Sequence, residues 1–486
     1  MFRLLEPANH LTPPDASFIE LFEKKWVIKE YAQVSDAPAF TCISYAWGKG
    51  KVENPVCVEQ HMSIRTIRAL ETAINVSQSK ENWGRNISFS HDGNSLKEAA
   101  GQAAAVNASQ AFWVDALCVP FDEPGRTVCL QRMGEIFSSA YQVLVVLREQ
   151  CSDAIQNASQ TEKLTSSDLS ILEKEDWVSR VWTYQEAVNS SRLYFGVEGN
   201  EDAIVSGNEF LNMIMTAIEV YKADNNLDKL AWEKQSPKLR SLERLLADYM
   251  MADFATRSAY QVMSVMENRC SERVDDHFYA MVGSITTTTE RVEGDETLEP
   301  SEFFMRSCER KGDFSFLYCG APRSEEVASG WRPIEGRFPA LLPDLITLGS
   351  SQAGRRELTH LQLDSMYRLV SGTITLDGIS AARWFVEDKS ETSSPNDVAR
   401  QILNRLRTLG FSGCGEHLEF ETGFFFPQKE PLNSDDIFAA VSHNIHWVTG
   451  GPGLLLRANS SDIDDFFDVG VFIGQRPKSG TRIMVG

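Results

Sequence analysis

The stretch AFTCISYAW, from Ala39 to Trp47, decides the fold. It is apolar on both faces of an extended chain, and the turn Gly48-Lys49-Gly50 follows it directly. A strand with this pattern is typical of the centre of a parallel sheet that helices cover on both sides. Isoleucine and leucine then recur at three- and four-residue spacing from Ile64 to Ile74, so a crossover helix is expected to begin near Ile64.

Three further apolar runs extend this sheet. The predicted strands are Ala111–Leu117 (AFWVDAL), Gln142–Leu147 (QVLVVL) and the short RLYFG at 192–196. Helical patterns over 126–140 and 176–188 separate the later strands. Strands that alternate with helices in this way predict an α/β fold, with a doubly wound parallel sheet and helices on both faces.

The chain is too long for one ordinary hydrophobic core, since it has 486 residues. Residues 1–200 form the predicted α/β core. An insertion rich in Ser, Asn, Gly and Ala is expected at 76–110, with a small-residue helix over 96–106, and 151–168 has the composition of a low-complexity linker. The predicted core therefore contains polar segments that we expect to lie outside its sheet.

The second half of the chain changes in character along its length. Residues 201–285 are mainly helical in pattern and are interpreted as a helical extension of the core. Residues 300–486 are expected to form a C-terminal α+β, β-rich region. Strands are predicted there in SGTITLDGIS (371–380) and in VGVFIGQRPKSGTRIMVG (469–486), where turn residues separate short apolar runs.

The composition excludes several classes of protein. Apolar residues make up 42% of the chain and charged residues 24%, which is typical of a globular protein. A net charge of −21 would repel nucleic acid and anionic membranes at long range, so neither is expected as a partner. The chain shows neither a signal peptide nor a run of ~20 apolar residues, which indicates a cytoplasmic protein without a membrane span. Nine scattered cysteines without a CxxC pair indicate reduced thiols.

Polar side chains at the predicted strand ends are the candidate site residues. Ser44 and Tyr45 end the first strand, where contact with a ligand and simple packing explain them equally well. Asp115 ends the second strand, and a buried carboxylate must be hydrogen-bonded, most simply to backbone N–H groups of the Cys118–Gly125 loop. Loops at the carboxyl ends of parallel strands are where open α/β sheets bind ligands.

An aromatic ring and a carboxylate share one face of the predicted 176–188 helix. Trp182 and Glu186 are four residues apart, so both would point in the same direction. A cationic ring over Trp182 would gain roughly 0.5–2 kcal/mol. The alternative for Glu186 is a solvated carboxylate or one paired with Arg180 or Arg192. The alternative for Trp182, and for Trp47 in the first motif, is an ordinary core or rim aromatic residue.

Three ordered motifs resemble the fungal heterokaryon incompatibility (HET) domain. They are Ser44-Tyr-Ala-Trp-Gly48, Trp113-Val-Asp-Ala-Leu-Cys118 with Gln131, Met133 and Ala140 downstream, and Arg180-Val-Trp-Thr-Tyr-Gln-Glu186. The later ERVDDHFYAMVG is similar to the segment that closes such domains, so the resemblance spans about Thr41–Gly283. One position departs from the family pattern, because Pro120 stands where Asn-Gln is usual. The resemblance implies a role in allorecognition and programmed cell death.

The order of these motifs is also similar to that of TIR domains, which implies a TIR-like, flavodoxin-like parallel sheet. In enzymatic TIR domains the Glu of W-x-x-x-E cleaves the nicotinamide–ribose bond of NAD. The resemblance therefore implies a catalytic role for Glu186, with NAD as substrate and no cofactor. Ser44, Tyr45, Trp47, Asp115 and Trp182 would line its pocket. The other class left open is a non-enzymatic module that signals by self-association, together with a separate sensor or incompatibility partner.

Two weaker patterns carry little chemistry. Cys414-x-x-His417 and His443-x-x-His446 have zinc-like spacing within each pair, but such pairs arise often by chance, and no metal site is predicted. The run Gly450-Gly-Pro-Gly453 lacks the Gly-Lys-Ser/Thr ending of a phosphate-binding loop, so nucleotide hydrolysis has no support.

Overall fold

The chain folds into two compact units in the computed structural model. The structure describes all residues except 11, 14–16, 79–109, 228, 252–256, 287–291, 293, 325–328, 335, 344–350, 358–359, 388–389, 412–416, 429–436, 460–461 and 477–478. The N-terminal unit comprises Met1–Asp253, Asn268–Glu272 and Thr286–Thr297. The C-terminal unit comprises Phe254–Glu267, Arg273–Ile285 and Leu298–Gly486. The chain thus passes between the units more than once.

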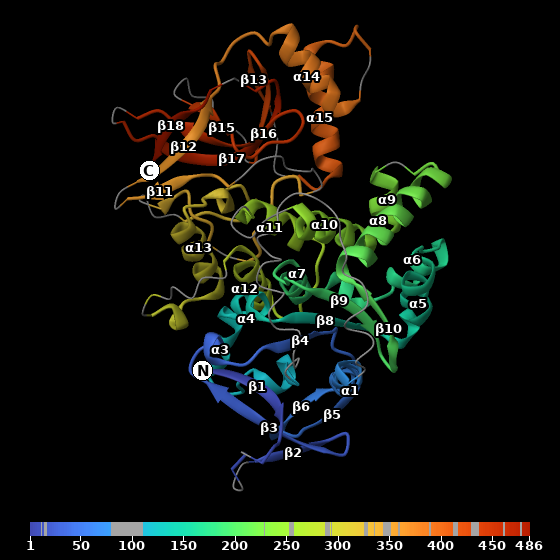
Figure 1. Ribbon diagram of the computed structural model, residues 1–486. Coiled ribbons are helices and arrows are strands. Elements are labelled where there is room, and N and C mark those ends of the chain that lie inside the picture. The colour runs from blue at the N-terminus through green and yellow to red at the C-terminus, as the bar shows by residue number, and fades with distance from the viewer. Residues whose placement is uncertain are drawn as a thin grey trace, which may run out of the picture. The chain divides into compact units, whose positions relative to one another are not determined.

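An eight-stranded mixed sheet forms the centre of the N-terminal unit (Figure 1). In sheet order its strands are β10 (Asn200–Ser206), β9 (Leu193–Val197), β8 (Gln142–Leu147), β4 (Phe40–Ser44), β7 (Ala111–Trp113), β1 (Phe2–Pro7), β3 (Lys24–Tyr31) and β2 (Phe18–Leu21). The pairs β9–β8, β8–β4 and β4–β7 are parallel, and the remaining pairs are antiparallel. The predicted parallel arrangement is therefore confirmed for four strands, which lie in the order second, first, third, fourth along the chain.

Helices cover both faces of this sheet. The first crossover helix, α1 (Ile64–Gln78), lies on one face, and α4 (Met133–Ser139) and α7 (Val181–Val188) lie on the other (Figure 1). The other helices of the unit are α2 (Asp115–Cys118), α3 (Gly125–Gln131), α5 (Ser152–Thr161), α6 (Ser166–Leu172), α8 (Gly207–Asp224), α9 (Lys229–Gln235) and α10 (Pro237–Met251). Every residue of β4 and β8 is buried, as the two-sided apolar runs predict.

Two predictions within this unit are wrong. The expected linker at 151–168 instead forms α5 and the start of α6, because Ala154, Ile155 and Ala158 give the polar segment one narrow buried face. The second strand ends at Trp113, and α2 begins at Asp115 rather than continuing the extended chain. Most of the predicted insertion, including the helix at 96–106, lies outside the described residues.

The C-terminal unit contains an antiparallel sheet, which confirms its β-rich character. Its strands run in the order β11 (Gly354–Arg356), β12 (Leu361–Arg368), β15 (Ile437–Ser442), β16 (Gly451–Arg457), β17 (Asp465–Gly474), β14 (Gly423–Pro427) and β13 (Leu418–Phe420), and β18 (Thr481–Val485) also pairs with β12. The helices are α11 (Ala259–Met266), α12 (Val274–Ile285), α13 (Pro300–Lys311), α14 (Leu376–Val386) and α15 (Pro395–Thr408).

The predicted strand at 371–380 is wrong, because α14 begins inside it. The Thr375 side chain accepts a hydrogen bond from the N–H of Gly378 (3.2 Å) and so caps the helix. Gly378 lies against the backbone of Thr422, where a Cβ atom would come within 2.5 Å of the Thr422 carbonyl carbon. Tertiary packing of this glycine therefore decides the conformation, and the local β-branched residues do not.

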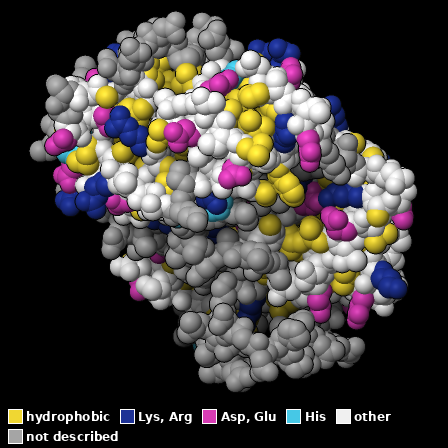
Figure 2. Space-filling model, turned by 90° about the horizontal axis from the view of Figure 1, so that it is seen from above, with side chains coloured by type: hydrophobic (Ala, Val, Ile, Leu, Met, Phe, Trp, Pro, Cys, Tyr) yellow, Lys and Arg dark blue, Asp and Glu magenta, His cyan; other side chains and the backbone are white. Residues whose placement is uncertain are grey.

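Three further findings concern the helices, the thiols and the surface. No helix among the described residues is long and apolar enough to cross a membrane. Each cysteine in the described part of the chain is a free thiol, as expected, and Cys414 lies outside that part. On the face shown in Figure 2, acidic, basic and hydrophobic side chains are interspersed, so the acidic excess is not gathered there.

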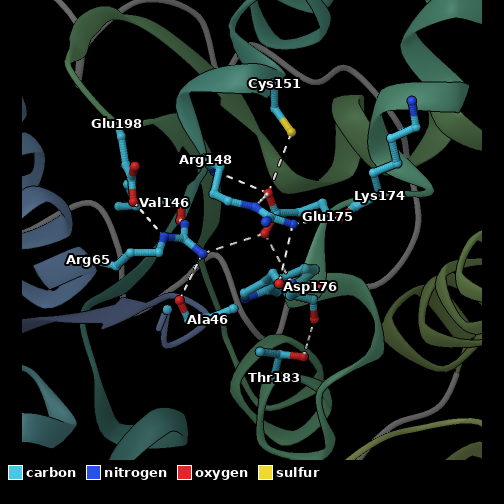
Figure 3. A network of polar contacts seen from close by, with 12 residues as sticks. Ala46, Arg65, Val146, Arg148, Cys151, Lys174, Glu175, Asp176, Thr183 and Glu198 are labelled. Atoms are coloured by element: carbon cyan, nitrogen blue, oxygen red, sulfur yellow. Dashed lines mark hydrogen bonds and ion pairs between the residues drawn. The ribbon is translucent and has the colours of Figure 1, made fainter. Parts of the chain in front are cut away.

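A buried arginine ties together the carboxyl ends of three parallel strands. Arg65, in the first turn of α1, donates to the carbonyl oxygens of Ala46 after β4 (2.8 Å) and Val146 in β8 (3.4 Å) (Figure 3). Its Nε donates to Glu198, which follows β9, at 2.6 Å. A second carboxylate, Glu175, lies 3.7 Å from its Nη1. The guanidinium is thus fully occupied by groups from separate elements.

The second carboxylate, Glu175, links Arg65 to β8 and to the turn before α7. Glu175 is 2% exposed, and Arg148 at the end of β8 pairs with it through Nε at 3.0 Å. The N–H of Trp177 also donates to Glu175 (3.2 Å), which fixes the short turn that precedes α7. The polar groups of α1, β8 and the α7 approach are therefore satisfied by one another inside the unit.

We expect Arg65→Met to destabilise the protein by about 3–5 kcal/mol, because it removes the closest cation from buried Glu198 and one of two arginines from buried Glu175. The matched control is Arg68→Ala, which removes an exposed arginine that pairs with the same Glu198 at 3.7 Å and should cost less than ~1 kcal/mol. Urea denaturation of the full chain measures both. Equal losses for the two variants would show that the Arg65 network contributes no more than a surface pair.

Candidate functional site

The candidate catalytic carboxylate, Glu186, is held against the end of the central strand. Ser44, the last residue of β4, donates its hydroxyl hydrogen to Glu186 Oε2. The Ser44 oxygen in turn accepts from Trp177 Nε1 (2.7 Å). The indole N–H can only donate, so Ser44 accepts from Trp177 while it donates to the carboxylate. Glu186 is 8% exposed, so it is not the solvated or arginine-paired side chain of the alternative interpretation.

The two arginines proposed as partners in that alternative have other contacts. Arg180 pairs with Glu272 at 3.5 Å, and Arg192 lies over the ring of Tyr141 at 4.3 Å. Neither forms an ion pair with Glu186 among the described residues. The alternative is therefore wrong, and Glu186 is a buried acid whose hydrogen bond comes from a hydroxyl group.

A second carboxylate, Asp115, binds the rest of the first motif. Tyr45 Oη donates to Asp115 Oδ1 (2.7 Å), and Trp47 Nε1 donates to Oδ2 (2.8 Å). The N–H of Ala116 also donates to Oδ1 (2.7 Å). Since Tyr45 gives its single hydrogen to Asp115, Thr66 of α1 must be the donor in the 2.7 Å bond to Tyr45 Oη. These donors differ from the Cys118–Gly125 backbone that the sequence indicated.

The two carboxylates lie close enough to affect each other's ionisation. Burial is the largest cause that raises the pKa of Glu186, to about 8, and the negative charge of Asp115 adds to the rise. The hydrogen bond from Ser44 and the charges of Arg180 and Arg269 work in the opposite direction. Burial also raises the pKa of Asp115, against the hydrogen bonds of Tyr45, Trp47 and Ala116. Three donors favour the ionised form of Asp115, so the proton of the pair resides on Glu186.

The structure brings together five of the six predicted site residues. Ser44 and Glu186 form one contact, and Tyr45, Trp47 and Asp115 form the other. Trp47 is 37% exposed, so it is a rim residue of this cluster. Trp182 is half-buried in the first turn of α7 and shares neither a hydrogen bond nor a ring contact with the other five among the described residues.

Sequence reasoning missed three residues that support this cluster, namely Thr66, Trp177 and Arg269. Trp177 lies three residues before the third motif, so its position was a usable signal. Thr66 and Arg269 lie far from the motifs they contact, and no local pattern marks them. No group of three or more His, Cys, Asp or Glu side chains arranged to hold a metal ion occurs in the part of the chain that the structure describes.

The cluster does not occupy the usual ligand crevice of an open α/β sheet. That crevice lies outside the carboxyl ends of two neighbouring strands, where the chain order reverses. Here the reversal falls between β4 and β8, and the guanidinium of Arg65 fills the space between Ala46 and Val146. The candidate site instead gathers on the other side of β4, toward the end of β7 and Asp115.

These features define an α/β protein with two coupled carboxylates at the end of its central parallel strand. Residues 40–186 match the model of the family described as heterokaryon incompatibility protein (HET). The match begins with β4 and ends on Glu186, so it contains both carboxylates and their donors. This part of the chain is therefore a heterokaryon incompatibility domain. Neither the curated proteins nor the solved structures contain a match to the chain.

We expect Gln185→Leu to stabilise the protein by roughly 1–3 kcal/mol, because it removes a buried amide that has no hydrogen-bond partner among the described residues. Gln185 is 0% exposed and precedes Glu186 on α7. Urea denaturation at pH 7 gives the difference, and Gln156→Leu on α5, which changes an exposed glutamine, is the control. A loss of stability would show that the amide binds buried water or a ligand.

We expect Glu186→Gln to flatten the pH dependence of stability. In the folded chain the pKa of Glu186 is about 8, above the value of 4.5 for the free side chain. Its contribution to stability is therefore fully present below pH 4.5 and is lost as the pH rises toward 8, by up to tenfold in the unfolding constant per pH unit. Gln cannot ionise, so the variant should equal wild type near pH 4.5 and exceed it near pH 8.

Urea midpoints at half-unit pH steps measure this difference. Glu219→Gln removes a 65% exposed carboxylate from α8 and controls for the loss of one negative charge. Parallel curves for wild type and Glu186→Gln would contradict the placement of the shared proton on Glu186.

Proposed function

We propose that this HET domain is a TIR-like, flavodoxin-like NAD glycohydrolase in which Glu186 acts on the nicotinamide–ribose bond. The observation that carries the proposal is the buried Glu186, held by Ser44 beside a second carboxylate, Asp115, whose charge adds to the burial that raises the pKa of Glu186. Acids whose pKa is raised toward the working pH by burial and a like charge are typical of catalytic sites. The protein would deplete NAD and so act as an allorecognition cell-death effector.

The reaction requires one carboxylate and water. The bond between ribose C1′ and the nicotinamide nitrogen breaks, and its electron pair neutralises the pyridinium ring. Water then adds to C1′ and releases a proton, so the products are nicotinamide, ADP-ribose and H⁺. A carboxylate stabilises the oxocarbenium-like transition state or holds the ribose hydroxyls. The leaving group is already cationic and needs no acid.

The hydrogen bonds indicate which oxygen of Glu186 would act. Oε2 accepts from Ser44, whose oxygen already accepts from Trp177. The proton of neutral Glu186 is therefore carried on Oε1, which leaves that atom to meet the substrate. A cationic nicotinamide ring beside Glu186 would favour its ionised form, so substrate binding itself would generate the carboxylate. The indole of Trp47, hydrogen-bonded to Asp115 and 37% exposed, offers an accessible aromatic surface beside this pair of acids.

One observation favours a second candidate. Glu186 is only 8% exposed, as suits an acid that simply fastens α7 to β4. In that case the domain would be a non-enzymatic module that signals by self-association and binds a separate sensor or incompatibility partner. The exposed Trp47 would then be part of the assembly surface.

We expect purified full-length protein to release nicotinamide from NAD, and Glu186→Gln to lower that rate by about 100-fold or more. Because the free enzyme must first lose the Glu186 proton, kcat/KM should rise with pH and level off above about pH 8. Chromatographic detection of nicotinamide measures both, at protein concentrations high enough for self-association. Arg355→Gln, a 75% exposed change in the C-terminal unit, serves as the control.

Expression in cells separates the two candidates. If wild type and Glu186→Gln release no nicotinamide yet both kill the cells that express them, the enzyme proposal fails and the assembly module is supported. Loss of killing together with loss of nicotinamide release supports the enzyme.

A further inference from the structure

A short segment from much later in the chain packs against the start of α7, the helix that carries Glu186. Asn268–Glu272 connects α11 to α12, two helices of the C-terminal unit, yet it belongs to the N-terminal unit. The N–H of Cys270 donates to the carbonyl oxygen of Ser179 (2.7 Å), and the Cys270 carbonyl oxygen accepts from Val181 (3.1 Å). This parallel bridge lies directly before the first turn of α7.

Arg269, in that segment, buries its guanidinium under α7. It is 2% exposed, and its Nη1 donates to the carbonyl oxygen of Arg180 (2.8 Å) and to Thr183 Oγ1 (3.2 Å). Its Nη2 donates to the carbonyl oxygen of Ser241 (3.5 Å), and the guanidinium lies 5.3 Å from the centre of the Tyr184 ring. All of these acceptors are neutral. Arg269 has no carboxylate within ion-pair distance among the described residues.

Burial of a cation without a paired anion costs free energy of folding. A favourable interaction elsewhere must offset the cost of burying Arg269. The negative charges that act on Arg269 are those of Asp248 and Glu186, at longer range. Burial lowers the pKa of Arg269 to about 10, which still leaves it charged at neutral pH. The neighbouring contacts hold this charge in place at the N-terminal end of the helix that carries Glu186.

Charged and titratable groups face Glu186 from every element around it. They are Cys42 of β4, Tyr45 directly after it, Asp115 of α2, Arg180 before α7, and Arg269. Asp115 disfavours the ionised form of Glu186, and the two arginines favour it. Arg180 is partly satisfied by Glu272 at 3.5 Å, so Arg269 is the arginine of this set without an ion pair of its own.

We propose that Arg269 is a positioning residue for Glu186, which anchors the first turn of α7 and adds, beside Arg180, a buried positive charge that favours the ionised carboxylate. The anchoring acts through the carbonyl oxygen of Arg180 and the hydroxyl of Thr183. The charge acts on the carboxylate directly and opposes Asp115. The effect on catalysis rests on the proposed function, but the effect on the ionisation of Glu186 does not.

The first experiment measures the ionisation of Glu186 without any enzyme assay. Urea midpoints are compared for chains with Glu186 and with Glu186→Gln, each carrying Arg269, Arg269→Gln or Arg269→Lys. The difference within each pair grows with pH until folded Glu186 ionises, and then it levels off. With Arg269→Gln we expect the pH at which the difference levels off to rise by roughly one pH unit. With Arg269→Lys we expect that pH to stay near its wild-type value.

Two controls keep this comparison decisive. Arg192→Gln removes an arginine that likewise lies over a tyrosine ring, at 4.3 Å from Tyr141, but does not touch the first turn of α7. It should leave the levelling point unchanged. If Arg269→Gln does not fold, Arg269→Met in the Glu186→Gln background tests whether removal of both charges restores folding. An unchanged levelling point, or an equal loss of folding in both backgrounds, would overturn the proposed role.

The second experiment uses nicotinamide release. Arg269→Gln should lower kcat about tenfold or more with little change in KM, and should shift the pH profile upward, with partial rescue by Arg269→Lys. A loss of activity with an unshifted pH profile would assign Arg269 a purely structural role. An inactive wild type would count against the proposed function only, because the urea experiment still decides the role of Arg269.

Discussion

The guanidinium of Arg65 is the interaction on which the N-terminal unit depends most. It joins α1 to the ends of β4, β8 and β9 through Ala46, Val146 and Glu198, which are far apart in the sequence. Parallel strands leave their terminal carbonyl groups at one edge of the sheet, and here a single side chain satisfies two of them. The same side chain fills the crevice in which open α/β sheets usually bind ligands. The cluster around Glu186 and Asp115 lies elsewhere along this edge.

The candidate cluster lies toward β7, and this position explains why two carboxylates can lie together there. Asp115 comes from the turn after β7, and Glu186 comes from the helix that packs over β4. Asp115 accepts three hydrogen bonds and Glu186 accepts one from Ser44, so the environments of the two acids are unequal. Like charges at short range cannot both ionise readily, and the less supported acid keeps the proton. The difference in hydrogen bonding thus assigns separate roles to two similar groups.

The sequence predicted the elements whose signal is local and missed the contacts that depend on tertiary structure. The apolar runs of β4 and β8 could only be central strands, and the order of the motifs placed Ser44 and Asp115 at neighbouring strand ends. The partners of Asp115 could not be predicted, because the phenol of Tyr45 and the indole of Trp47, which follow β4, compete with loop backbone groups. α5 was missed because its buried face consists of alanine and one isoleucine. α14 was missed because the packing of Gly378 against Thr422 overrides the local strand propensity.

The segment Asn268–Glu272 shows why the motifs alone do not define the candidate site. The family match ends at Glu186, but the first turn of the helix that carries this residue is anchored by Arg269 and Cys270, more than eighty positions later. A chain cut after Asp253 would keep the three ordered motifs and lose both anchors. The carbonyl oxygen of Ser179 would lose the N–H of Cys270, that of Arg180 would keep only the hydroxyl of Thr183 among its side-chain donors, and one of the two positive charges that oppose Asp115 would be absent. The chemistry of Glu186 is therefore a property of the folded unit with its returning segment.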